Sequence, residues 1–171
     1  MDSTKQERLD SKIAENIASL REKNHTLLLA TNSADYVPHV SYSPFAYREG
    51  HYYILVSDIA QHGQNLKQQP ALSIMLIEDE QDAKSLYARV RLTYDATAKS
   101  IDKTSAEGRL ALDELATRFG EIIDNLSKLN DFALYAITPD NGRFVKGFGQ
   151  AFTIDGSDKP SALQLTEGHR K

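Results

Sequence analysis

The side chains that could take part in catalysis or ligand binding in this chain are histidines, arginines and carboxylates, because its 171 residues include no cysteine. That absence excludes disulfides, zinc-thiolate sites, iron-sulfur clusters and thiol nucleophiles. The five histidines show no HxxxH spacing and no cluster with acidic residues, so a free metal site is not indicated. Any metal must be held by histidine or carboxylate, or must arrive inside a cofactor.

His62 follows Gln61 in a short segment that predicts one or two helical turns, which Pro70 ends before the next strand. A histidine in such a place more often caps or packs locally than binds a ligand. Arg89 and Arg91 lie two residues apart in a segment that predicts a strand. Their guanidinium groups match carboxylate or phosphate geometry, although such a pair is more often a solvated sheet face.

Gly147 and Gly149 share one face of the segment 143–154 if it is a strand, with three phenylalanines on the other face. A strand face without side chains admits a planar ring such as haem or flavin, or a partner subunit. The alternative is a bulge or close strand packing.

His169 is three residues from the end, where disorder is the default expectation. The nine residues that follow Pro160, up to His169, can nevertheless span about 30 Å when extended, which is enough to reach a neighbouring subunit. Asp131 comes just before the last predicted hairpin, and its simplest role is that of a turn residue accepting backbone hydrogen bonds.

Periodicity predicts the elements that must position these residues. Leu9, Ile13, Ile17 and Leu20 have the spacing of an amphipathic helix, and a second such helix is expected around Leu110, Ala111, Leu115 and Phe119. Apolar runs and alternation predict strands at Thr26–Thr31, Val37–Tyr47, His51–Ser57, Leu72–Ile77 and Leu86–Ala96. A closing hairpin is expected from Phe132–Ile137, a turn at Pro139–Gly142 and a strand at Arg143–Ile154.

Size and charge narrow the class of protein. A chain of 171 residues with 40% hydrophobic content predicts a single domain with a sizeable core. The net charge of -4 argues against duplex nucleic acid or an anionic membrane as partner. Neither a membrane span nor a secretory signal is indicated, so we expect a cytoplasmic location.

The stretch Ser57–Ile77, SDIAQHGQNLKQQPALSIMLI, resembles the FMN-binding split-barrel superfamily that includes the pyridoxamine phosphate oxidases. Further likeness lies in HVSYSPFAY at His39–Tyr47, in YARVRLTYDA at Tyr87–Ala96, between Arg118 and Phe152, and in the final EGHRK. Together these passages are most similar to the haem-utilisation HutZ/HugZ group.

The resemblance implies a mainly β, α+β fold: an antiparallel split β-barrel of six to seven strands with flanking helices, assembled as a homodimer. Residues 1–155 would form the barrel domain, and 156–171 a C-terminal tail. His169 would bind haem iron, and Asp131 of the other subunit would hydrogen-bond its imidazole. Arg91 and His62 would lie near the haem, and the open strand face at Gly147 and Gly149, inferred above from the pattern, would be a place for its ring.

The hypothesis from the sequence is therefore a haem-binding enzyme that degrades haem oxidatively to a biliverdin-like product and iron. The chain has no GxGxxG fingerprint or cysteine cluster, so an external reductant or reductase is implied. One alternative is an FMN-dependent oxidoreductase in which Arg89, Arg91 and Lys146 hold the phosphate. Another is a non-catalytic haem carrier or storage protein.

Overall fold

A computed structural model describes residues 3–164 of the chain. The helices are α1 (Ser3–Lys23), α2 (Gln61–Gln68), α3 (Ala106–Phe119) and α4 (Ile122–Ser127), with 3-10 turns η1 (Glu80–Asp82) and η2 (Leu86–Ala88). The strands are β1 (Thr26–Asn32), β2 (Pro38–Pro44), β3 (Ala46–Arg48), β4 (His51–Ser57), β5 (Ala71–Ile77), β6 (Arg91–Ile101), β7 (Phe132–Gly147), β8 (Gln150–Ile154) and β9 (Pro160–Gln164). None of the helices within residues 3–164 is long and apolar enough to cross a membrane.

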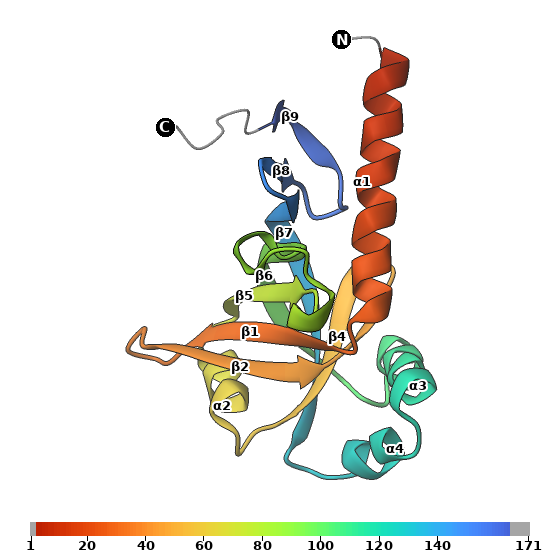
Figure 1. Ribbon diagram of the computed structural model, residues 1–171. Coiled ribbons are helices and arrows are strands. Elements are labelled where there is room, and N and C mark those ends of the chain that lie inside the picture. Colours follow the sequence, from red (N-terminus) through yellow and green to blue (C-terminus); the bar gives the residue numbers. More distant parts are fainter. Residues whose placement is uncertain (1–2, 165–171) are drawn as a thin grey trace.

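The described strands form one antiparallel sheet in the order β2-β1-β5-β6-β7-β4-β3; in addition, β8 pairs with β7, and β9 pairs with β8. Strands β2 and β4 approach each other, so the sheet curves back on itself. This antiparallel α+β arrangement with flanking helices agrees with the expected split barrel (Figure 1). The sheet has nine strands rather than six or seven, because β8 and β9 extend it beyond the path of seven.

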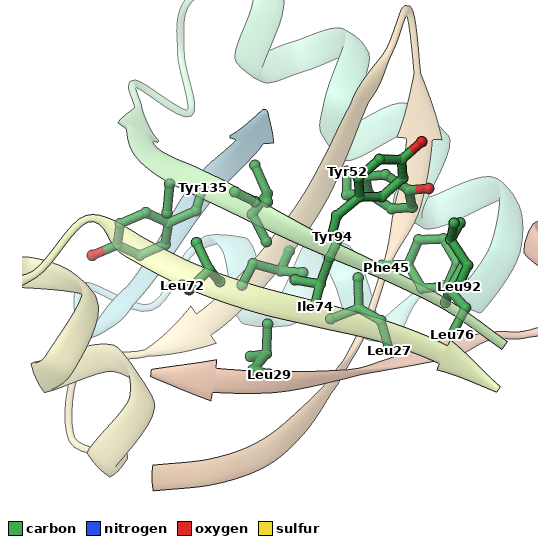
Figure 2. Close-up of a cluster of buried hydrophobic side chains, with 14 of the residues drawn as sticks. Leu27, Leu29, Phe45, Tyr52, Leu72, Ile74, Leu76, Leu92, Tyr94 and Tyr135 are labelled. Carbon is green, nitrogen blue, oxygen red and sulfur yellow. The ribbon is translucent and has the colours of Figure 1, made fainter. Parts of the chain in front are cut away.

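The main core lies inside the curved sheet, where alternate residues of each strand point inward. Figure 2 shows Leu27, Leu29, Tyr52, Ile74 and Tyr94 in this cluster. Helix α1 covers it with the buried residues Ile13, Ile17 and Leu20, which confirms the predicted amphipathic helix. A second cluster lies where α3 and α4 cover the other side of the sheet, and contains Tyr53, Leu115, Ile123 and Leu134. Within α3 the predicted core position Leu110 is wrong, because its side chain is exposed.

The predicted closing hairpin is wrong, because β7 is one long strand where a turn was expected. The chain does not turn at Pro139–Gly142 but continues through this segment, paired with β6, and reverses only between Gly147 and Gln150. Gly142 is needed for another reason: a Cβ there would lie 2.4 Å from Cδ1 of Tyr94, so the glycine admits the buried ring. The positive φ occurs instead at Gly149, +66°, inside the actual reversal.

The predicted strand Leu86–Ala96 is wrong in its first half, because β6 begins only at Arg91. Before it, Ser85 accepts a hydrogen bond from the backbone N–H of Tyr87 and caps the 3-10 turn η2. The side chains of Leu86 and Tyr87 are 66% and 91% exposed, so the apolar alternation in this part does not report a core face.

The C-terminal strands are fixed to α1 by a buried polar cluster. Arg21 Nη2 lies 2.5 Å from Asp158 Oδ2, and the hydroxyl of Tyr94 donates to Asp158 Oδ1 at 2.5 Å. Arg21 Nε also donates to the hydroxyl of Tyr52, and its guanidinium lies 3.6 Å from the ring centre of Tyr47. Burial, followed by the hydrogen bond to Asp158, raises the pKa of Tyr94. The expected tail segment 156–171 thus continues as β9, paired with β8, as far as Gln164.

Candidate functional site

Asp131 is held where two strands of the sheet meet. Strand β4 ends at Ser57, which is paired in register with Phe132 at the start of β7. The Ser57 hydroxyl donates to Asp131 Oδ2 at 2.8 Å, and the backbone N–H of Asp58 donates to the Asp131 carbonyl at 2.6 Å. The Ser57 oxygen itself accepts from the N–H of Ile59 at 3.2 Å. The carboxylate is therefore fixed through one oxygen at a partly exposed corner.

The second carboxylate at this corner is neutralised. Asp58 Oδ2 lies 2.8 Å from Lys67 Nζ, and the hydrogen bond to Asp58 raises the pKa of Lys67. Within residues 3–164, Oδ1 of Asp131 has no hydrogen-bond partner, and no group of three or more metal-ligating side chains is found. Oδ1 of Asp131 thus offers a hydrogen-bond acceptor. Ile59, which follows Asp58 in the chain, has an exposed side chain.

His62 lies at the start of α2 and faces β2, at one end of the sheet order. Its Nδ1 is 2.9 Å from the Ser41 hydroxyl of β2. Burial, and secondarily the charge of His39, lower the pKa of His62, which favours the neutral imidazole. Helix α2 is fixed to β1 by Asn65, whose buried side-chain amide donates to Thr31 Oγ1 at 3.0 Å.

Arg89 and Arg91 do not form the predicted pair on one strand face. Arg89 precedes β6, and its Nη2 and Nε donate to the Glu78 carbonyl at 2.5 and 3.1 Å, with Nη1 3.7 Å from Glu80. Arg91 is the first residue of β6, and its Nη1 donates to the Arg89 carbonyl at 3.2 Å. The guanidinium group of Arg89 is thus committed within the protein.

Gly147 and Gly149 lie at the reversal between β7 and β8. The positive φ of Gly149 supports the simpler interpretation of that residue as a turn glycine. At Gly147 an added Cβ would come no closer than 3.8 Å to Gln150 Oε1, so the space beside it is open. Phe148 between them is exposed rather than packed on the core.

These residues form two separate groups in one protomer. Arg91 is paired with Val145 near Gly147, at one end of β7, whereas Asp131 and Ser57 lie at the other end, beside Phe132. Phe132 and Val145 are thirteen residue steps apart along the strand, roughly 40 Å if fully extended. Figure 1 shows β7 running along the length of the molecule. His169 lies outside the described residues.

Sequence reasoning assigned Asp131 its haem-site role only through the family likeness, identified Arg91 first as one of an arginine pair, and missed Ser57 and Ser41. A serine at a strand end carries no pattern that distinguishes it from a turn residue. The signal that could have indicated Ser57 is its register opposite Phe132, which depends on the pairing of β4 with β7.

Comparison with known proteins identifies the family of this chain. Residues 13–146 match the family model described as pyridoxamine 5'-phosphate oxidase. The chain is also 47% identical over 167 residues to a protein named heme oxygenase HutZ from Vibrio cholerae, covering 98% of this chain and 95% of that protein. The chain belongs to the HutZ group of the pyridoxamine 5'-phosphate oxidase family.

Solved structures of the family agree with this assignment. The structure of HutZ from Vibrio cholerae, described as a heme storage protein, is 44% identical with a TM-score of 0.71, covering 74% of this chain and 89% of that one. ChuZ from Campylobacter jejuni is 29% identical with a TM-score of 0.83, covering 94% of this chain and 66% of that one.

Proposed function

We propose that this protein binds haem at the interface of a homodimer and degrades it oxidatively, with release of iron and a biliverdin-like product. The observation that carries the proposal is the 47% identity, over nearly the whole chain, to a protein named heme oxygenase. The fixed and partly exposed Asp131 carboxylate adds support from this chain's own residues.

In this proposal the partner's His169 binds the haem iron, and Asp131 accepts a hydrogen bond from the other nitrogen of that imidazole. A carboxylate in this role fixes the tautomer of the histidine and makes it a stronger donor to the metal. Asp131 fits the role because Oδ1 has no hydrogen-bond partner within residues 3–164, and because Asp58 beside it is neutralised by Lys67. Bound haem supplies the reactivity toward oxygen or peroxide that ring opening requires.

A dimer would bring the two groups of site residues together. Asp131 and Arg91 lie at opposite ends of β7, so one ligand reaches both only if they come from different protomers. The outer face of β1 and β2 supports such an assembly, because it exposes Val40, Tyr42 and part of Leu28, with Leu28 and Tyr42 paired in register. Arg91, His62 and Gly147 would then border the haem, and an external reductant or reductase would supply the electrons.

Two other functions remain candidates on specific observations. Haem storage without degradation is favoured by the Vibrio cholerae structure, which is described as that of a heme storage protein. An FMN-dependent oxidoreductase is favoured by the match to the pyridoxamine 5'-phosphate oxidase family. The second would have to hold phosphate with Arg91 and Lys146, because Arg89 is engaged by the Glu78 carbonyl and Glu80.

Haem titration followed by turnover with reductant and oxygen tests the proposal. We expect a Soret band and loss of the haem spectrum in wild type, loss of ordered coordination in His169→Ala, and retained binding in Asp131→Asn. Ring opening in Asp131→Asn should slow by about 10- to 100-fold, because the amide is a weaker acceptor than the carboxylate.

The alternatives have different outcomes. An intact haem ring after prolonged incubation with reductant and oxygen would indicate storage, and a yellow protein as purified would indicate a flavin. Unchanged spectra and rates in both variants would overturn the proposed roles of His169 and Asp131.

A further inference from the structure

We propose that Ser57 is a positioning residue of the haem site, whose hydroxyl fixes the rotation of the Asp131 carboxylate so that Oδ1 stays available to the imidazole N–H of the haem ligand. The inference rests on the proposed function, because it assumes that Asp131 is the acceptor for that imidazole. It adds a residue whose hydroxyl touches neither haem nor histidine but acts through Asp131.

The geometry at this corner leaves the carboxylate little freedom. The Asp131 carbonyl is held by the N–H of Asp58 at 2.6 Å, and Oδ2 is held by the Ser57 hydroxyl at 2.8 Å. With its backbone and one oxygen both fixed, the carboxylate cannot rotate without losing a hydrogen bond.

The direction of the hydrogen bond from Ser57 is also set. Its oxygen accepts from the N–H of Ile59 at 3.2 Å, and a hydroxyl has a single proton to donate. That proton is directed to Asp131, the acceptor at 2.8 Å. The resulting chain from Ile59 through Ser57 to Asp131 places one carboxylate oxygen inside the corner and leaves the other for an incoming N–H group.

The surroundings favour a donor that comes from outside the protomer. Two described cations lie near this corner, and both are engaged elsewhere: Lys67 is paired with Asp58 at 2.8 Å, and Lys103 donates to the carbonyls of Leu129 and Phe132 at 3.1 and 2.8 Å. Ile59, whose N–H donates to Ser57 and whose side chain is 76% exposed, supplies an apolar surface at this corner that a bound ring or a partner segment would cover. An imidazole N–H that must hold one tautomer needs an acceptor in a fixed position, and Ser57 provides that constraint.

The test compares haem-loaded wild type with Ser57→Ala, Ser57→Thr and Asp131→Asn. The matched control is Ser73→Ala, which removes another hydrogen bond from a serine to an aspartate across neighbouring strands, Ser73 Oγ to Asp95 Oδ1 at 3.2 Å. The readouts are the ferrous iron-histidine stretching frequency from resonance Raman spectra, and the ferric/ferrous midpoint potential. Both report the strength of the hydrogen bond to the histidine, which a purely structural role of Ser57 would not alter.

We expect Ser57→Ala to lower the stretching frequency and raise the potential, in the same direction as Asp131→Asn but by less. Ser57→Thr should restore the wild-type values because it keeps the hydroxyl, and Ser73→Ala should match wild type. Ring opening in Ser57→Ala should slow by about tenfold, the lower end of effects at outer-sphere partners.

Two results would overturn this inference but leave the proposed function intact. One is wild-type spectra in Ser57→Ala while those of Asp131→Asn are shifted, and the other is a higher iron-histidine stretching frequency in Ser57→Ala. The second result would mean that the hydroxyl weakens the carboxylate instead of orienting it. If Asp131→Asn itself matched wild type, or wild type showed no iron-histidine band, the proposed site would fail and this inference with it.

Discussion

Single side chains at the candidate site differ in how the fold has prepared them. Asp131 is fixed by Ser57 and by the N–H of Asp58, with one carboxylate oxygen left for a ligand. His62 is instead half-buried against Ser41, and burial lowers its pKa. Asp131 is thus a hydrogen-bond acceptor held in a fixed position, whereas His62 is an imidazole whose protonation is disfavoured in the folded protein.

The lowered pKa of His62 predicts a measurable pH dependence of stability. The unfolded chain binds a proton near the ordinary histidine pKa, whereas the folded protein binds it only at lower pH, so stability falls as the pH drops below about 6.5. Replacing the imidazole in His62→Gln should reduce this acid-induced loss. Urea unfolding at pH 7.5 and pH 5.5 measures the difference, and an identical loss in wild type and His62→Gln would contradict it.

The elements at the C-terminal end of the described chain depend on one buried cluster. Asp158 connects α1 to the loop before β9 through Arg21, and connects the same loop to β6 through Tyr94. The side chains of Arg21 and Asp158 are only 11% and 12% exposed. Charges so well covered are costly to leave without a partner.

We therefore predict that Asp158→Ala lowers the free energy of unfolding by about 3–5 kcal/mol, because it leaves Arg21 buried without its counter-charge. Asp124→Ala is the control, since it removes an exposed pair with Lys128 of similar length, 2.7 Å, and should cost at most about 0.5 kcal/mol. Chemical denaturation of both variants measures the difference. Equal effects in the two variants would show that the Asp158 cluster does not fix the C-terminal strands.

The sequence predicted most elements of this fold because their apolar periodicity reflects real burial, as at Ile13, Ile17 and Leu20 of α1. The prediction failed where a residue pattern that is typical of a turn or a strand arises from a different structural feature. The Asn-Gly pair ending at Gly142 suggested a turn, but the glycine makes room for the ring of Tyr94. Apolar alternation around Tyr87 suggested a strand, but the chain there makes an exposed 3-10 turn.

The candidate site was less accessible from the sequence than the fold. Asp131 carried no pattern of its own and was identified through family likeness, and Ser57 was missed because its role depends on cross-strand register. Contacts of this kind arise between segments more than 70 residues apart, which no local periodicity encodes.

At the scale of the whole molecule, one protomer carries two groups of candidate site residues, one at each end of β7. Asp131 lies beside Phe132 at one end, and Arg91 is paired with Val145 near the other. A two-fold dimer can bring unlike ends of the strand together, because residue i of one protomer contacts residue j of its copy, and residue j contacts residue i. The central claim is therefore that the partner's His169 and this protomer's Asp131 serve the same haem.

A mixing experiment tests that claim most directly. His169→Ala and Asp131→Asn are each purified, then mixed under conditions that exchange subunits, and haem degradation is compared with that of the separate variants. A site shared between chains gives each mixed dimer one intact site, so random exchange should restore about a quarter of wild-type turnover. If mixed dimers form and turnover stays at the average of the two variants, then His169 and Asp131 do not meet across the interface, and the proposed site is wrong.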